Sequence, residues 1–289
     1  MDFRTDLAIE RREILGKNEP DGVKSRKFTD GDVKLTVIRI ESCVGAEALG
    51  KPVGTYISAD IPDLVSNPAD SENTVTALAR QIESLLPKDG TVLVAGLGNT
   101  DITPDAVGPK SVSMVLATRH ISSEVGESIG LENLRSVAGF IPGVMGKTGV
   151  ESAESIKGIV NSVKPSAVIV IDALAARKMT RLGRTVQMSD TGIIPGSGVG
   201  NSRSAINMET VGVPVISIGI PTVVDAQTLV NDLTDDKCKI SNEENKRMIV
   251  TPREIDIVVQ RASELIGLAV NKALQPELSI EEILMLVSD

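Results

Sequence analysis

The chain has 289 residues, 41% of them hydrophobic and 24% charged, which is typical of a globular protein large enough to bury a core. Three Phe, one Tyr and no Trp offer no platform for stacked bases, and a formal net charge of −9 repels a phosphate backbone, so direct nucleic-acid binding is disfavoured. One histidine and two distant cysteines exclude zinc sites built from several His or Cys ligands and favour a reduced, cytoplasmic compartment.

The N-terminal segment, residues 1–30, is charged and interrupted by glycine and proline, which suggests a loosely attached arm. Its first residues mix both charge signs and contain no long apolar run, so they do not resemble a signal peptide. No stretch of the chain is long and apolar enough to span a membrane. We therefore expect no membrane association. Residues 33–40 alternate apolar and polar side chains and predict a half-buried strand.

Beyond this segment, buried strands alternate with amphipathic helices. Short apolar runs predict strands over 91–95, 167–171 and 213–220. Helical spacing predicts helices over 72–86, 106–119, 225–233, 252–273 and 279–287, and a T-x-x-E capping box at Thr148 and Glu151 opens one more, which Pro165 ends. Residues 234–250 are charged and predict an exposed insertion. The alternation predicts one α/β domain over 1–289, with a mostly parallel twisted sheet and helices on both faces.

Two acidic residues follow the predicted core strands. Asp105 comes after the first strand through a glycine turn, and Asp172 ends the second. Because ligands of open α/β sheets bind outside the carboxyl ends of the strands, the two carboxylates could meet there and share a proton. One could then activate water while the other polarises a carbonyl group. The alternative is structural: Asp105 caps a helix, and Asp172 is satisfied by nearby backbone N–H groups.

Other polar motifs point to chemistry less clearly. The run GLGN at 96–99 lacks the spacing of a nucleotide-binding loop, and the glycine-rich run at 196–203 is better interpreted as a turn or a substrate-binding loop. No G-x-S-x-G marks a serine nucleophile. We interpret His120 as a residue at a helix C-terminus, and Cys43 and Cys238 as buried packing residues.

Four strings together resemble the germination protease family of spore-forming bacteria. They are RTDLAIE at 4–10, GLGNTDITPDAVGPK at 96–110, IDALAAR at 171–177 and DTGIIPGSGVGNSR at 190–203. The resemblance implies a homotetrameric endopeptidase of the spore core that degrades small acid-soluble spore proteins, with a fold similar to that of hydrogenase maturation endopeptidases. It also implies that Asp105 and Asp172 are catalytic, as an atypical aspartic-type pair that needs no metal ion and no cofactor.

The same resemblance suggests a role for the N-terminal string at 4–10. RTDLAIE is similar to the family's substrate string, which is cut after an acidic residue, so we expect a zymogen that cuts itself between Asp6 and Leu7. Residues 1–6 are then the remnant of a propeptide. An acidic residue before the cut needs a cationic partner, and Arg177 and Arg203 are the candidates, although each could instead form a surface ion pair.

Two other functions remain open at this point. The chain could be a metal-binding maturation endopeptidase of the hydrogenase-processing type, which bound metal in the purified protein would reveal. It could also be a non-catalytic α/β scaffold in which both aspartates are structural, which would bind partners and cleave nothing.

Overall fold

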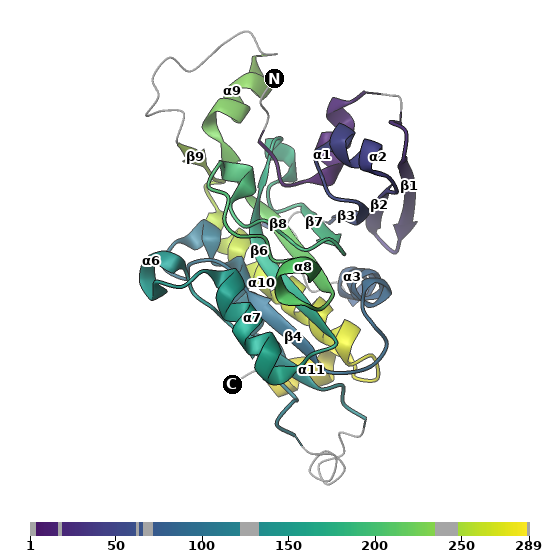
Figure 1. Cartoon of the computed structure of the whole chain (residues 1–289), viewed down its shortest axis with the longest axis vertical. Coiled ribbons are helices and arrows are strands. Elements are labelled where there is room, and N and C mark those ends of the chain that lie inside the picture. Colours follow the sequence, from purple (N-terminus) through teal and green to yellow (C-terminus); the bar gives the residue numbers. More distant parts are fainter. Residues whose placement is uncertain are drawn as a thin grey trace.

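A mixed β-sheet forms the centre of the molecule (Figure 1). The computed structural model describes residues 4–16, 19–61, 64–65, 72–121, 133–234 and 248–287. Within them the strands lie in the order β1-β2-β3-β7-β8-β6-β4-β5, and β9 pairs with β8. Their bounds are β1 Val23–Asp30, β2 Val33–Ile40, β3 Gly54–Asp60, β4 Val92–Gly96, β5 Val137–Phe140, β6 Ala167–Ala176, β7 Thr185–Ser189, β8 Val215–Asp225 and β9 Ile249–Val250.

The sheet has a parallel half and an antiparallel half. Strands β8, β6, β4 and β5 pair in parallel, whereas β1, β2, β3 and β7 pair antiparallel, and β7 joins the two halves through β8. The α/β class with a large sheet flanked by helices is confirmed. The expectation of a mostly parallel sheet describes only the half that contains β4 and β6.

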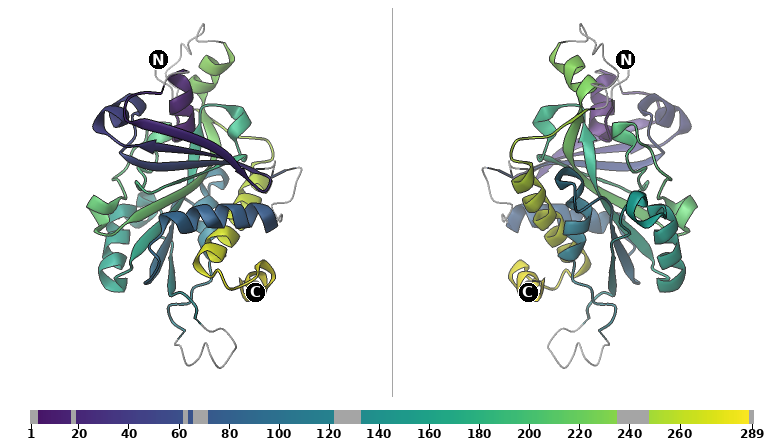
Figure 2. Two further views of the ribbon diagram at one scale, coloured as in Figure 1. Left: turned by 90° about the vertical axis from the view of Figure 1, so that its right-hand side faces the viewer. Right: turned by 90° about the vertical axis from the view of Figure 1, so that its left-hand side faces the viewer.

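Helices cover both faces of the parallel half, as Figure 2 shows for α10 and α7. Alternate side chains of β6 explain this: Ile169 and Ile171 belong to the core cluster that includes α3, α4 and α10, whereas Val168 and Val170 pack with α7 and α8. The helix bounds are α1 Ala8–Ile14, α2 Cys43–Leu49, α3 Glu72–Leu85, α4 Val107–Ser113, α6 Met145–Thr148, α7 Ser152–Val163, α8 Met208–Val211, α9 Ala226–Leu233, α10 Ile255–Leu274 and α11 Ile280–Val287. No helix in the described part of the chain combines the length and the hydropathy needed to cross a membrane.

The N-terminal segment is packed into the fold, so the expectation of a loosely attached arm is wrong for residues 4–16. Leu7 and Ala8 have no solvent exposure and form a core cluster with residues of β2 and β3. Glu10 is equally buried and accepts hydrogen bonds from the hydroxyl of Thr5 and from the backbone N–H groups of Arg177 (2.7 Å) and Lys178 (2.9 Å). This buried carboxylate therefore ties the arm to the chain that follows β6.

Helix α4 ends at Ser113, six residues before the predicted end at Arg119. The side chain of Asn271 in α10 explains the early end, because it accepts a hydrogen bond from Leu116 N and donates one to Met114 O, both at 2.8 Å. His120 consequently lies in a turn, and its interpretation as a helix C-terminal residue is wrong.

Other local predictions also need correction. Thr148 ends α6 instead of opening α7, and the N-cap of α7, Glu151, makes no capping hydrogen bond through its side chain. Cys43 is exposed, not buried. Cys238 and most of the predicted insertion lie outside the described residues.

Candidate active site

Asp105 is held by the glycine turn that follows the fully buried strand β4. The chain reverses at Gly98, whose φ is +114° and where a Cβ atom would lie 1.9 Å from the carbonyl oxygen of Asp105. Only glycine fits this position. Beyond the turn, Asp105 ends a short 3₁₀ helix, Thr103–Asp105, and its Oδ2 accepts a hydrogen bond from Asn99 N at 2.8 Å.

Asp172 lies inside β6 rather than at its end, because pairing with β8 continues from Asp172 opposite Gly219 to Ala176 opposite Val224. The side chain is only 5% exposed, and its Oδ1 accepts a hydrogen bond from Ala173 N at 2.9 Å. The predicted strand ends at residue 171, because the aspartate and the small alanines that follow it do not continue the run of large apolar side chains.

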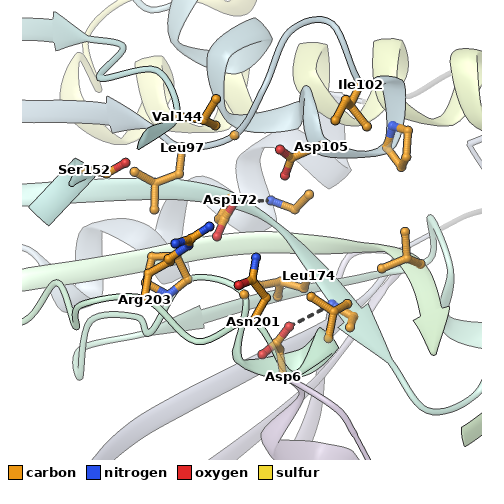
Figure 3. Close-up of a pocket in the computed structure, with 18 of the residues that line it drawn as sticks. Asp6, Leu97, Ile102, Asp105, Val144, Ser152, Asp172, Leu174, Asn201 and Arg203 are labelled. Atoms are coloured by element: carbon orange, nitrogen blue, oxygen red, sulfur yellow. Dashed lines mark hydrogen bonds between the residues drawn. The ribbon is translucent and has the colours of Figure 1, made fainter. Parts of the chain in front are cut away.

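Both aspartates line one cavity of about 520 Å³, whose wall includes the apolar side chains of Leu97, Ile102 and Val144 (Figure 3). Burial raises the pKa of Asp172 well above its ordinary value, and the charges of Asp105 and Asp6 raise it further. Burial also raises the pKa of Asp105, against the hydrogen bond from Asn99 N. Both shifts favour the protonated carboxyl form, and two such groups in one cavity can serve as general acid and general base.

The N-terminal arm enters the same cavity through Asp6 (Figure 3). The carboxylate of Asp6 accepts hydrogen bonds from Ser197 Oγ (2.7 Å) and Ala175 N (2.9 Å), and its backbone N–H donates to Ala175 O (2.9 Å). Arg4 fastens the arm on its other side, because its guanidinium lies 3.2 Å from Asp225. The acidic residue before the predicted cut is therefore bound to the strand that carries Asp172.

The carbonyl group of Asp6, which belongs to the Asp6–Leu7 bond, is bound by two donors. Lys51 Nζ and Gln187 Nε2 lie 2.9 and 3.0 Å from this oxygen. Burial lowers the pKa of Lys51, and the charge of Asp6 opposes that shift. Sequence reasoning missed Lys51, Gln187 and Ser197. Of these three, only Ser197 could have been suggested by the sequence, since it belongs to the glycine-rich run at 196–203 that we interpret as a turn or a substrate-binding loop.

Of the two predicted cationic partners of Asp6, one pairs with another acidic residue and the other lines the cavity. Arg177 forms an ion pair with Asp232 at 3.0 Å and is not among the residues that line the cavity. Arg203 lines the cavity as an exposed residue, with its backbone N–H bonded to Pro195 O at 3.0 Å. Lys51 contributes a positive charge close to Asp6.

Within the described part of the chain, no group of three or more His, Cys, Asp or Glu side chains is arranged to hold a metal ion. The cavity contains the buried carboxyl group of Asp172, the half-buried one of Asp105 and the bound segment around Asp6.

The sequence profile described as Germination protease matches residues 4–245, most of the chain. The chain belongs to the germination protease family. It is similar to the germination protease of Caldanaerobacter subterraneus subsp. tengcongensis, with 42% identity over 97% of this chain and 96% of that protein. The germination protease of Clostridium tetani is 40% identical over 98% of both chains. That of Priestia megaterium is 42% identical over 80% of this chain and 66% of its own length.

Family membership confirms the resemblance noted in the sequence and the coarser functional prediction, that of a protease. A structural comparison also found a likeness to a [NiFe] hydrogenase maturation protease from Thermococcus kodakarensis, at 17% identity and a TM-score of 0.37, over 66% of this chain and 98% of that one.

Proposed function

We propose that the protein is an endopeptidase that begins the degradation of small acid-soluble spore proteins during germination, with Asp105 and Asp172 activating the attacking water. The observation that carries this proposal is the pair of carboxyl groups in one cavity, both with raised pKa values. Raised pKa values favour the protonated form of the pair, in which one carboxyl group can serve as general acid and the other as general base.

The surroundings of the two carboxyl groups assign their roles. Asp172 is the more deeply buried and faces the charges of Asp105 and Asp6, so it retains the proton and serves as the general acid. Asp105 is stabilised as an anion by Asn99 N and removes a proton from water. The water oxygen adds to the carbonyl carbon, and the C–N bond breaks as the amine takes a proton from the pair.

The same proposal includes a zymogen that cuts its own Asp6–Leu7 bond, a homotetrameric assembly and a location in the spore core, all of which the family resemblance implies. The binding of Asp6 in the cavity of the two aspartates supports the self-processing. Incubation of the purified protein with a small acid-soluble spore protein, followed by mass spectrometry of the fragments, tests the function. Intact substrate after exhaustive incubation would favour the non-catalytic scaffold.

Substitution of Asp6 tests the self-processing. Asp6→Glu should still be processed, because it keeps a carboxylate, whereas Asp6→Ala should be processed poorly. Asp6→Lys should not be processed, since its ammonium group would face Lys51 and the donors Ser197 Oγ and Ala175 N. N-terminal sequencing of aged protein identifies the site. Equal processing of the lysine variant, or cleavage at another bond, would contradict the role of the arm as a substrate mimic.

Chelation distinguishes the proposed mechanism from that of a metal-binding maturation endopeptidase. Dialysis against a chelator should leave the rate of proteolysis within about twofold of the untreated protein, because the carboxyl pair itself supplies the acid and the base. The rate before and after dialysis, together with the metal content of the protein, is the measurement. A loss of activity that added divalent ions reverse would favour the metal-dependent alternative.

A further inference from the structure

The cavity contains a bound carboxylate whose surroundings are built for it. We propose that Ser197, Gly198 and the backbone N–H of Ala175 form the specificity site of the protease, which binds the acidic side chain that precedes the cleaved bond in protein substrates. This inference rests on the proposed endopeptidase function. In the described structure the site is filled by the chain's own Asp6 (Figure 3).

The donors of the site fit a carboxylate better than an amide. One oxygen of Asp6 accepts from Ser197 Oγ at 2.7 Å and the other from Ala175 N at 2.9 Å, so both oxygens are satisfied by donors. An asparagine here has a single acceptor oxygen, which Ala175 N requires, so its NH₂ group would have to face Ser197 and turn that hydroxyl from a donor into an acceptor. Hydrogen bonds to a charged acceptor are also stronger than those to a neutral one.

Gly198 provides the space that the carboxylate occupies. A Cβ atom at this position would lie 2.2 Å from Asp6 Oδ2 and 2.7 Å from Ala175 Cβ. The residue is buried in the short 3₁₀ helix Ser197–Val199, and its φ is outside the left-handed region, so alanine is compatible with the backbone there. The missing side chain is thus required by the occupant of the site and by the close approach of Ala175, and not by the φ angle of Gly198.

The backbone contacts fix the position of the acidic residue along β6. Asp6 N donates to Ala175 O at 2.9 Å, and Lys51 Nζ and Gln187 Nε2 bind its carbonyl oxygen. Since Ala175 and Asp172 belong to the same strand, a residue held on Ala175 is held at a set position relative to the carboxyl pair. An extended substrate segment that replaces the arm can form the same contacts.

A hydrogen-exchange experiment tests the site independently of activity. In full-length protein carrying Asp172→Asn, which keeps the arm uncut, exchange of the peptide covering residues 4–9 is followed by mass spectrometry. Addition of Ser197→Ala or Gly198→Ala should accelerate exchange of this peptide at least about tenfold, since the first removes a donor to the carboxylate of Asp6 and the second adds a methyl group that collides with it. Gly158→Ala is the matched control, because the methyl group that it adds in α7 would meet no atom within 4 Å.

A selectivity measurement tests the same site in catalysis. Wild-type and variant proteins are assayed with the heptapeptide Arg-Thr-Asp-Leu-Ala-Ile-Glu and its Asn counterpart at the third position. The wild type and Gly158→Ala should prefer Asp strongly, Ser197→Ala should lose about tenfold of that preference in kcat/KM, and Gly198→Ala should lose cleavage of the Asp peptide.

The two measurements separate the specificity site from the proposed function. Unchanged exchange in both variants would overturn the site, whatever the activity. Accelerated exchange in a protein whose wild type cleaves neither peptide nor spore protein would leave the site standing and refute the endopeptidase proposal. An unchanged Asp preference in Ser197→Ala and Gly198→Ala would overturn the role of the site in selecting substrates.

Discussion

Replacement of either aspartate of the pair by asparagine should lower the rate of proteolysis by roughly 10³-fold or more, because two groups that share one proton act as a unit. The measurement is the initial rate of cleavage of a spore protein by Asp105→Asn and by Asp172→Asn. Near-normal cleavage by either folded variant would remove that residue from the mechanism.

The stability of the Asp172→Asn variant provides the control for folding. Because the pKa of Asp172 is raised in the folded protein, the folded state binds this proton more tightly than the unfolded state. The stability that this proton contributes is present below the ordinary carboxyl pKa of 3.8 and is lost as the pH rises through the raised value. Asparagine cannot ionise, so the variant should be at least as stable as the wild type at neutral pH and should unfold with a weaker pH dependence. A less stable variant would show that Asp172 is needed for folding.

Glu10→Ala should destabilise the protein by about 3–5 kcal/mol, since it removes a buried charge that satisfies several donors. The backbone N–H groups of Arg177 and Lys178 would lose their acceptor, and the Nε of Arg181, 3.5 Å from Glu10, would lose an ion-pair partner. Urea unfolding of full-length protein measures the change.

Glu13→Gln is the matched comparison in the same helix. Glu13 pairs with Lys178 at 2.8 Å and Arg181 at 2.5 Å, but its side chain is 35% exposed, so its loss should cost only about 0–1 kcal/mol. Similar losses for the two variants would contradict the assignment of Glu10 as the anchor of the arm.

The parallel half of the fold was predictable because its strands are apolar on both faces. The runs that became β4, β6 and β8 bracket Asp105 and Asp172, and this was enough to place both residues in one cavity. In contrast, β1 has one buried residue, Val23, among mostly exposed positions, so its pattern does not distinguish an edge strand from an arm.

The polar contacts of the site could not be predicted in the same way. Lys51 contacts Asp6 across 45 positions of sequence, and Gln187 does so across 181. Neither belongs to a motif, so their position depends on the pairing of β3 with β7. Charge complementarity predicts an arginine partner for Asp6. The carboxylate is bound instead by the hydroxyl of Ser197 and the backbone N–H of Ala175, and neither group is marked by a distinctive residue type in the sequence.

The hydroxyl group that links the arm to its buried anchor has a consequence for a chain cut after Asp6. Thr5 Oγ1 accepts from Leu7 N at 3.0 Å and donates to the carboxylate of Glu10. Cleavage would remove Thr5, whose hydroxyl connects Leu7 N to the carboxylate of Glu10. It would also convert Leu7 N into an α-ammonium group, so the hydroxyl-mediated contact would be replaced by an internal ion pair with Glu10. The newly formed chain end would then be charge-compensated inside the protein, at the junction with the strand that carries Asp172.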